Sequence, residues 1–207
     1  MPEYDTTKRN YEAAHEWHAE KSMAYNWTPH IDSFLQLVPA NTKILDAGCG
    51  DGRDVRTFKS RNVDVEGLDY SHPAIESLKQ QFPDGKFYEA DMRNTGLPDN
   101  SYGGVWACAS ILNISKADAP TALREFRRVL VPSGILFLSV KEGEGERMVP
   151  DKAGERFFNF FSQEELTSLV QVAGFTIDHT EVMEDTFGKA PEGQKLPRWI
   201  CVYAKKI

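Results

Sequence analysis

Apolar and polar residues alternate along most of this chain in a pattern that predicts strands and helices in turn. Short apolar runs typical of buried strands lie at residues 44–47, 63–68, 86–90, 102–109 and 135–140. Helical spacing of apolar residues separates most of these runs, as for Val55 and Phe58, for Ile75, Leu78 and Phe82, and for Leu123, Phe126 and Leu130. This alternation predicts βαβ units, so we expect an α/β fold with a doubly wound, mostly parallel sheet and helices on both faces.

The N-terminal residues show helical spacing without strands. One helix is predicted over about residues 6–23, with Tyr11, Ala14 and His18 on one face. A second helix is predicted to begin at Thr28 as its N-cap, because a proline follows at the first helical position. This segment therefore adds two helices before the first strand.

The C-terminal residues predict a different end to the sheet. A helix begins at Ser162, which forms a capping box with Glu165, and stops at Gly174. Residues 175–182 and 199–204 then resemble strands, and the linker between them is polar and rich in glycine and proline. Strands joined by such a linker can be antiparallel, so we expect one antiparallel C-terminal strand.

Glycine recurs at every second position in the sequence KILDAGCGDGRD, directly after the first strand. Gly48, Gly50 and Gly52 give this turn backbone freedom that indicates close approach to a ligand. Ligands of doubly wound sheets bind at the carboxyl ends of strands, where this turn is predicted to lie. The dinucleotide fingerprint is G-x-G-x-x-G, whereas Arg53 occupies the sixth position here, which disfavours a nicotinamide-dependent oxidoreductase.

Three acidic residues follow or end successive predicted strands. Asp46 precedes the glycine turn, Asp69 ends the second strand and Asp91 ends the third. One aspartate at such a position is a common turn residue, but three together after successive strands are much stronger evidence for a ligand site, and Asp69 has roughly the spacing at which an acid binds a ribose diol. A charge at Asp46 also disfavours a pyrophosphate and suits a cation.

These segments carry a family resemblance. ILDAGCGDG, VEGLDYS, FYEADM, GVWACASILNI and REFRRVLVPSGILFLSV resemble the successive motifs of class I S-adenosylmethionine (SAM)-dependent methyltransferases, which have a Rossmann-like fold. The resemblance runs from about Thr42 to the C-terminus and is greatest for small bacterial-type enzymes. It implies one domain over 1–207, with a helical cap at 1–40, a SAM-binding core at 41–207, and loops 141–161 and 183–198 over the site.

The resemblance also implies cofactor contacts. Gly48 and Gly50 are expected to let the backbone lie against the methionine part of SAM, and Asp69 to bind both ribose hydroxyls. Asp46 is expected near the SAM ammonium, and Asp91 at the adenine amino group. The full implied set is Asp46, Gly48, Cys49, Gly50, Asp69, Tyr70, Asp91, Met92 and Ala107. The family often has histidine where this chain has Asn113, so no base is assigned there.

Candidates for proton transfer lie outside those motifs. His15, His18 and Tyr11 share the first predicted helix, and imidazole suits proton transfer near neutral pH. Glu142 and Glu144 follow the fifth core strand and are further candidates. A solvated surface role is an alternative for each of them. No residues have metal-ligand spacing, so we expect no metal.

Composition narrows the partners. The formal net charge is −7, which argues against a large nucleic-acid surface. No apolar run approaches the roughly 20 residues of a membrane span, no secretory signal is evident, and three cysteines without metal spacing suit a cytoplasmic protein. We therefore expect methyl transfer to nitrogen or oxygen of a small molecule, with S-adenosylhomocysteine (SAH) as product, by a monomer or homodimer. The alternatives are a protein methyltransferase and a catalytically inactive SAM- or SAH-binding partner protein.

Overall fold

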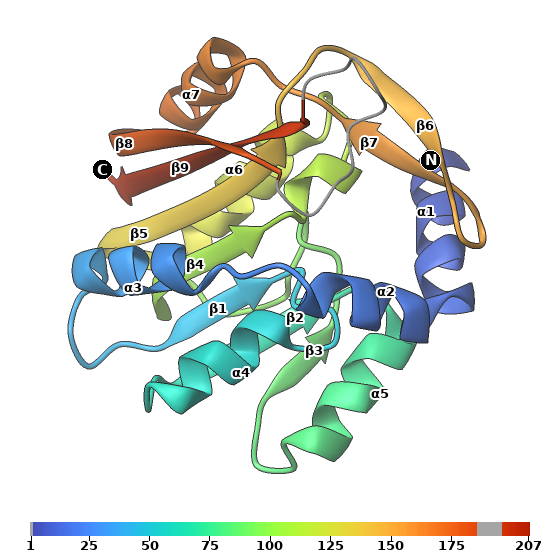
Figure 1. The fold of residues 1–207 in the computed structure, drawn as a ribbon. Helices are drawn as coiled ribbons and strands as arrows, with labels where there is room; N and C mark the ends of the chain where they lie inside the picture. Colours follow the sequence, from blue (N-terminus) through green and yellow to red (C-terminus); the bar gives the residue numbers. More distant parts are fainter. Residues whose placement is uncertain (1, 186–195) are drawn as a thin grey trace.

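Figure 1 shows the computed structural model of the protein, which describes residues 2–185 and 196–207. The main strands are Ile44–Ala47 (β1), Val65–Asp69 (β2), Phe87–Glu89 (β3), Tyr102–Cys108 (β4), Leu130–Lys141 (β5), Phe175–Glu184 (β8) and Arg198–Lys206 (β9). In the described part of the chain they form one seven-stranded sheet in the order β3-β2-β1-β4-β5-β9-β8.

Strand direction in this sheet confirms the predicted fold class. β1 pairs in parallel with β2 and β4, and parallel pairing continues from β2 to β3 and from β4 to β5. β9 runs antiparallel to both of its neighbours, β5 and β8. The single antiparallel strand therefore lies between β5 and β8, and β8 forms the edge.

Helices cover both faces of the sheet. The helices after the N-terminal segment are Thr28–Leu37 (α3), Arg53–Ser60 (α4), His72–Gln81 (α5), Ala119–Val129 (α6) and Gln163–Val172 (α7). Helices α3, α4 and α5 lie on one face, and α6 and α7 lie on the other (Figure 1). Ser162 caps α7 by accepting a hydrogen bond from the Glu165 amide, as predicted. Among the described residues, no helix is long and apolar enough to cross a membrane.

An aromatic cluster joins the sheet to α3 and α4. Trp106 stacks on Phe137 with ring centroids 3.9 Å apart, and the edges of Phe34 and Phe58 meet the Trp106 ring. A Cβ atom on Gly104 would lie 2.6 Å from the Phe34 ring. Glycine at this strand position therefore lets α3 pack closely on β4 and β5, and α3 belongs to the core rather than to a cap.

The N-terminal segment differs from the prediction in two ways. The predicted single helix over 6–23 is wrong, because the structure has Pro2–Ala13 (α1) and His15–Met23 (α2), with a break at Ala14. α1 packs on the strand Gly154–Asn159 (β7) and on α5, whereas α2 contacts the glycine turn through His15. Because these contacts lie in different places, the two helices run in different directions. The N-cap of α3 is Trp27 rather than Thr28.

A hairpin occupies most of residues 141–161, where a loop was expected. Its strands are Glu146–Asp151 (β6) and Gly154–Asn159 (β7), which pair antiparallel as a separate two-stranded sheet. α1 contacts β7 and α5, so the N-terminus of the chain lies beside the hairpin (Figure 1). Most of the other expected loop, 183–198, lies outside the described residues.

Candidate functional site

A cavity of about 570 Å³ opens at the carboxyl ends of the parallel strands. The glycine turn and the ends of β2 and β4 line one half of it. We call this part the cofactor half. α2, residues 25–27, the hairpin and the start of β9 line the other part, which we call the aromatic half, and α1 contributes residues between the two. Doubly wound sheets bind their ligands at this end of the sheet, so we treat the cavity as the candidate site.

Backbone geometry explains the glycines of the turn. Gly48 has φ +89°, and a Cβ atom there would lie 2.3 Å from the Ser110 Cβ. Gly50 has φ +48°, and a Cβ atom there would meet no atom within 4 Å. Gly48 thus brings the turn close to the loop after β4, whereas Gly50 presents its backbone beside open space. Both of these residues, and Cys49 between them, line the cavity.

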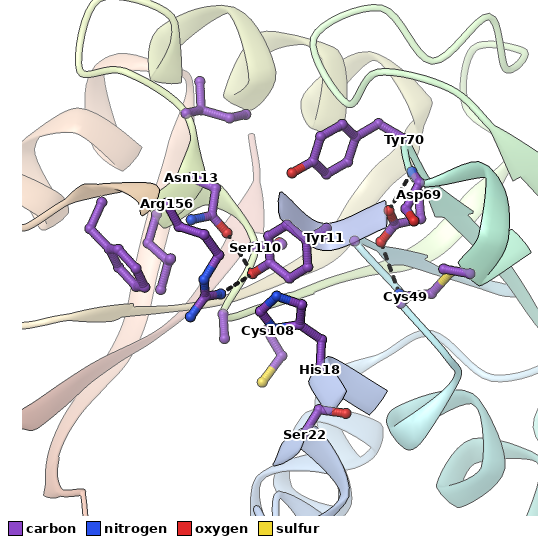
Figure 2. A pocket seen from close by; sticks show the side chains of 18 of the residues that line it. Tyr11, His18, Ser22, Cys49, Asp69, Tyr70, Cys108, Ser110, Asn113 and Arg156 are labelled. Carbon is purple, nitrogen blue, oxygen red and sulfur yellow. Dashed lines mark hydrogen bonds between the residues drawn. The ribbon is translucent and has the colours of Figure 1, made fainter. Parts of the chain in front are cut away.

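Asp69 is fixed at the end of β2 by backbone donors. The Gly50 N–H donates to Asp69 Oδ2 at 2.9 Å, and the Ser71 N–H donates to Oδ1 at 2.8 Å. Figure 2 shows the carboxylate at the cavity wall beside Tyr70. Burial raises the pKa of Asp69, while these N–H donors favour the ionised form. Each oxygen retains a lone pair for a ligand hydroxyl.

Asp46 lies beneath the glycine turn and does not line the cavity. Its side chain is buried, and its Oδ2 has no hydrogen-bond partner among the described residues. Burial raises the pKa of Asp46 well above its usual value, and the nearby Asp54 adds to the shift. An unpartnered buried carboxyl oxygen indicates a missing polar partner, such as water or a ligand donor.

The far end of the cofactor half is covered by α1. Asp91 lines the cavity with Met92 and holds Arg93 through paired hydrogen bonds. Tyr4 of α1 lies over the Arg93 guanidinium, and its ring centroid is 5.2 Å from that of Tyr70. Burial and a hydrogen bond to Asp91 raise the pKa of Tyr4. The sequence analysis did not identify Tyr4, which stands among polar residues without an apolar pattern.

Ala107 is the one predicted cofactor residue on β4. It is fully buried within the sheet and does not line the cavity. The cavity wall at this point consists of Cys108, Ala109 and Ser110 instead. The end of β4 therefore reaches the cavity through these three residues and not through Ala107.

Tyr11 lies where the two halves of the cavity meet. Its hydroxyl donates to Asn113 Oδ1 at 3.1 Å and accepts a hydrogen bond from Arg156 at 2.5 Å (Figure 2). Its ring meets Tyr70 on one side and His18 on the other. Burial raises the pKa of Tyr11, although the Arg156 guanidinium opposes the shift. Tyr11 is therefore a protonated, oriented hydroxyl group. Arg156 was missed because it lies 145 residues away in sequence.

His18 is a neutral imidazole at this junction. Its Nε2 lies 2.9 Å from Asn10 Oδ1, and in the tautomer in which Nε2 donates to this oxygen, Nδ1 carries the lone pair. Burial and the positive charge of Arg156 lower the pKa of His18 to about 4. His18 can accept a proton at neutral pH, but only as a weak base.

Replacing His18 is expected to reduce the acid sensitivity of folding. The pKa of His18 is about 4 in the folded chain against an ordinary 6.5, so unfolding takes up a proton between these values. The stability that His18 contributes is present above about pH 6.5 and is lost as the pH falls toward 4. Urea unfolding at about pH 7.5 and about pH 4.5 should show a smaller difference for His18→Gln than for the parent. The exposed His72→Gln is the control, and equal pH sensitivity in His18→Gln and the parent contradicts this expectation.

The remaining candidates have fixed partners or lie outside the cavity. His15 contacts Asp51 of the glycine turn at 2.6 Å, which joins α2 to the cofactor half. Glu142 lines the cavity and pairs with Arg198, and Glu144 is exposed and does not line it. Aromatic side chains line much of the aromatic half of the cavity, namely Tyr25, Trp27, Phe158, Phe160 and Trp199.

Residues 44–134 match the family model described as methyltransferase domain. A malonyl-acyl-carrier-protein O-methyltransferase of Pectobacterium atrosepticum is 31% identical over 116 residues, which are 54% of this chain and 45% of the relative. A 2-methyl-6-phytyl-1,4-hydroquinone methyltransferase of Synechocystis sp. is 28% identical over 120 residues, which are 56% of this chain and 37% of the relative. The chain thus spans about half or less of the length of these relatives.

Solved structures share the fold. A Burkholderia thailandensis 1,6-didemethyltoxoflavin-N1-methyltransferase, crystallised with its substrate and SAH, superposes with a TM-score of 0.75 at 19% identity, covering 96% of this chain and 86% of that one. A cyclase named SpnF superposes with a TM-score of 0.67 at 20% identity, covering 86% and 81%. The family match over residues 44–134 and the shared fold together show that this part of the chain is similar to methyltransferase domains.

Proposed function

We propose that this protein transfers the methyl group of SAM to a nitrogen or oxygen atom of a small molecule. The observation that carries the proposal is the Asp69 carboxylate, which backbone donors hold beside the open glycine turn in the same cavity as a second, aromatic half. SAM supplies an activated methyl group on a sulfonium. The chain itself must bind this cofactor, align the acceptor and exclude water.

The residues of the cofactor half suit the parts of SAM. The Gly48 and Gly50 backbone and the loop after β4 would hold the methionine part, and the unpartnered Asp46 oxygen beneath the turn would accept from the SAM ammonium, directly or through water. Asp69 would accept from the ribose hydroxyls, and Tyr70, Asp91 and the Met92 amide would hold the adenine. The ring of Tyr4 already contacts Tyr70, so cofactor entry requires α1 to move or to share this surface.

Tyr11, His18, Arg156 and Asn113 lie between the cofactor half and the aromatic half. In the transfer, the acceptor lone pair forms the new bond to the methyl carbon while the S–CH₃ bond breaks, and its electrons leave sulfur neutral in SAH. A proton on the acceptor must then be lost. The His18 lone pair can take this proton. The Tyr11 hydroxyl, which Asn113 and Arg156 hold in place by hydrogen bonds, would orient the acceptor.

A catalytically inactive binding protein is the second candidate. It is favoured by the low pKa of His18, which makes it a weak base. Thermal unfolding of the full chain with SAM, SAH and NAD in turn separates these candidates from an oxidoreductase. A ligand at 100 times its dissociation constant stabilises the fold by about 2.7 kcal/mol. Stabilisation by SAM and SAH, together with SAH release when small metabolites are added, supports the proposal. Stabilisation by NAD alone contradicts it.

Cys49→Ser is expected to retain most of the turnover, because SAM is already activated and no covalent enzyme intermediate is needed. Burial raises the pKa of the Cys49 thiol well above its usual value, so it is not a thiolate at neutral pH. SAH release by the variant, with SAH affinity measured in parallel, tests this. Loss of turnover with unchanged SAH affinity would show that the thiol takes part in the reaction.

A further inference from the structure

Cations outnumber carboxylates in the aromatic half of the cavity. Three carboxylates that line this half and Asp185 beside it form ion pairs, and the pairs are Asp54 with Arg53, Glu142 with Arg198, Asp151 with Arg156 and Asp185 with Lys141. Lys21 and Arg147 also line the cavity, and neither has a carboxylate oxygen within 4.0 Å among the described residues. Two cations that line the cavity therefore have no carboxylate partner among the described residues, in a chain whose formal net charge is −7.

Arg147 is an exposed residue that lines the cavity and stacks on an aromatic ring. Its guanidinium carbon lies 3.7 Å from the centroid of the Phe160 ring, and Phe160 is only 9% exposed. One guanidinium N–H donates to the Glu144 backbone oxygen at 3.4 Å. A guanidinium that stacks on an aromatic face keeps N–H groups at its edge free for bidentate bonds to a carboxylate. This is more order than an exposed arginine needs for solubility alone.

Lys21 reaches the same cavity from another element. It lies on α2, and its ammonium is 4.6 Å from the centroid of the Trp17 ring. Arg147 comes from β6, so the two charges approach from two walls. Tyr25, Trp27 and Trp199 line the same half and offer apolar surface for a flat ring.

We propose that the methyl acceptor is an aromatic carboxylate whose carboxylate binds the edge of Arg147, with Lys21 adding favourable charge. That the bound molecule is the methyl acceptor rests on the proposed function, whereas the anion site does not depend on it. The carboxylate anchors the molecule, and its ring lies along the aromatic wall. A separate nitrogen or oxygen atom of the same molecule is then directed toward the Tyr11 and His18 junction.

Calorimetry with simple probes tests the site before any acceptor is known. Benzoate is titrated into the full chain with and without saturating SAH, and benzamide and benzylamine are the uncharged and cationic matches. Benzoate should bind more tightly than either match, and added salt should weaken it. Arg147→Gln should weaken benzoate roughly tenfold, the cost of a hydrogen bond to a charged group, while leaving SAH affinity unchanged. Arg124→Gln, on the exposed surface of α6, is the matched control and should have no effect.

The outcomes separate this inference from the proposed function. Equal binding of benzoate and benzamide, no measurable benzoate binding, or unchanged affinity in Arg147→Gln overturns the anion site. Binding of benzoate that depends on Arg147 in a chain that does not bind SAH or SAM supports the anion site and overturns the methyltransferase proposal. Phenyl phosphate serves as a further probe, and binding tighter than benzoate would assign the site to phosphate rather than carboxylate.

Discussion

Asp69→Ala is expected to bind SAM at least a hundredfold more weakly than the parent chain while it keeps the fold. In the proposed complex the carboxylate accepts hydrogen bonds from both ribose hydroxyls. A hydrogen bond to a charged group contributes about 1.5–3 kcal/mol, and each 1.4 kcal/mol is tenfold in affinity. The substitution also removes the acceptors of the Gly50 and Ser71 amides, so the glycine turn loses its anchor. Both effects act on SAM in the same direction.

Two further variants separate recognition from loss of the turn. Asp69→Asn keeps the shape and one oxygen acceptor, so it retains one of the two backbone hydrogen bonds that anchor the turn, while SAM binding still falls. Asp64→Ala replaces an exposed aspartate just before the start of the same strand and should change nothing. Titration calorimetry with SAM and SAH gives the affinities, and thermal unfolding reports the fold. Parent-like SAM affinity in a folded Asp69→Ala would remove the ribose assignment.

Much of the fold could be predicted because its signals are local. The alternation of strands and helices and the helix-free linker before β9 gave the parallel sheet with one antiparallel strand. The break at Ala14 and the β6–β7 hairpin were not predicted, since each depends on contacts between distant segments. The polar sequence of β6 also hides its strand character, because this hairpin packs on α1 rather than in the sheet.

The candidate site was predictable on one side only. The glycine turn and the acidic residues each follow or end a predicted strand, so their positions could be predicted from the strand pattern. Gly48, Gly50, Asp69 and Asp91 line the cavity together. The other side is assembled from α1, α2, the hairpin and the start of β9. Arg156 and Arg147 have no sequence motif, and only the fold brings them to the cavity that holds Tyr11.

The N-terminal helices contact both the hairpin and the glycine turn, and we propose that they act as a lid over the cavity. Thr7 is fully buried, and its hydroxyl accepts a hydrogen bond from the Phe157 N–H of β7 at 2.9 Å, so α1 packs against the hairpin. His15 closes α2 on the glycine turn. An isolated helix of this length is marginal in water, so these contacts are what keep the segment ordered. Opening them would expose the cofactor half and allow SAM to enter and SAH to leave.

A chain that begins at Ala24 is therefore expected to fold and bind SAH, more weakly than the parent, but to lose most methyl transfer. Ala24 is the right start because Trp27 is 3% exposed and packs in the core against Phe137 and Trp199. The shortened chain lacks Tyr11 and His18 and leaves the sulfonium methyl open to water, which competes with the acceptor and weakens its positioning. SAH affinity by calorimetry and SAH release with a working acceptor provide the two readouts.

The full-length variant Tyr11→Phe makes the same test without removing a helix. It keeps the ring between Tyr70 and His18 but leaves Asn113 Oδ1 without its donor and Arg156 Nη1 without this acceptor, while Arg156 Nε still pairs with Asp151. Turnover should fall about ten- to a hundredfold, since an unmet buried hydrogen bond costs about 1–3 kcal/mol, with SAH affinity close to that of the parent. Arg9→Ala, on the exposed face of α1, should leave both quantities unchanged. The shortened chain can lose function through instability, so the point variant is the stricter test of a role in methyl transfer. Parent-like turnover in Tyr11→Phe, or in a folded chain from Ala24, shows that the N-terminal helices only stabilise the fold.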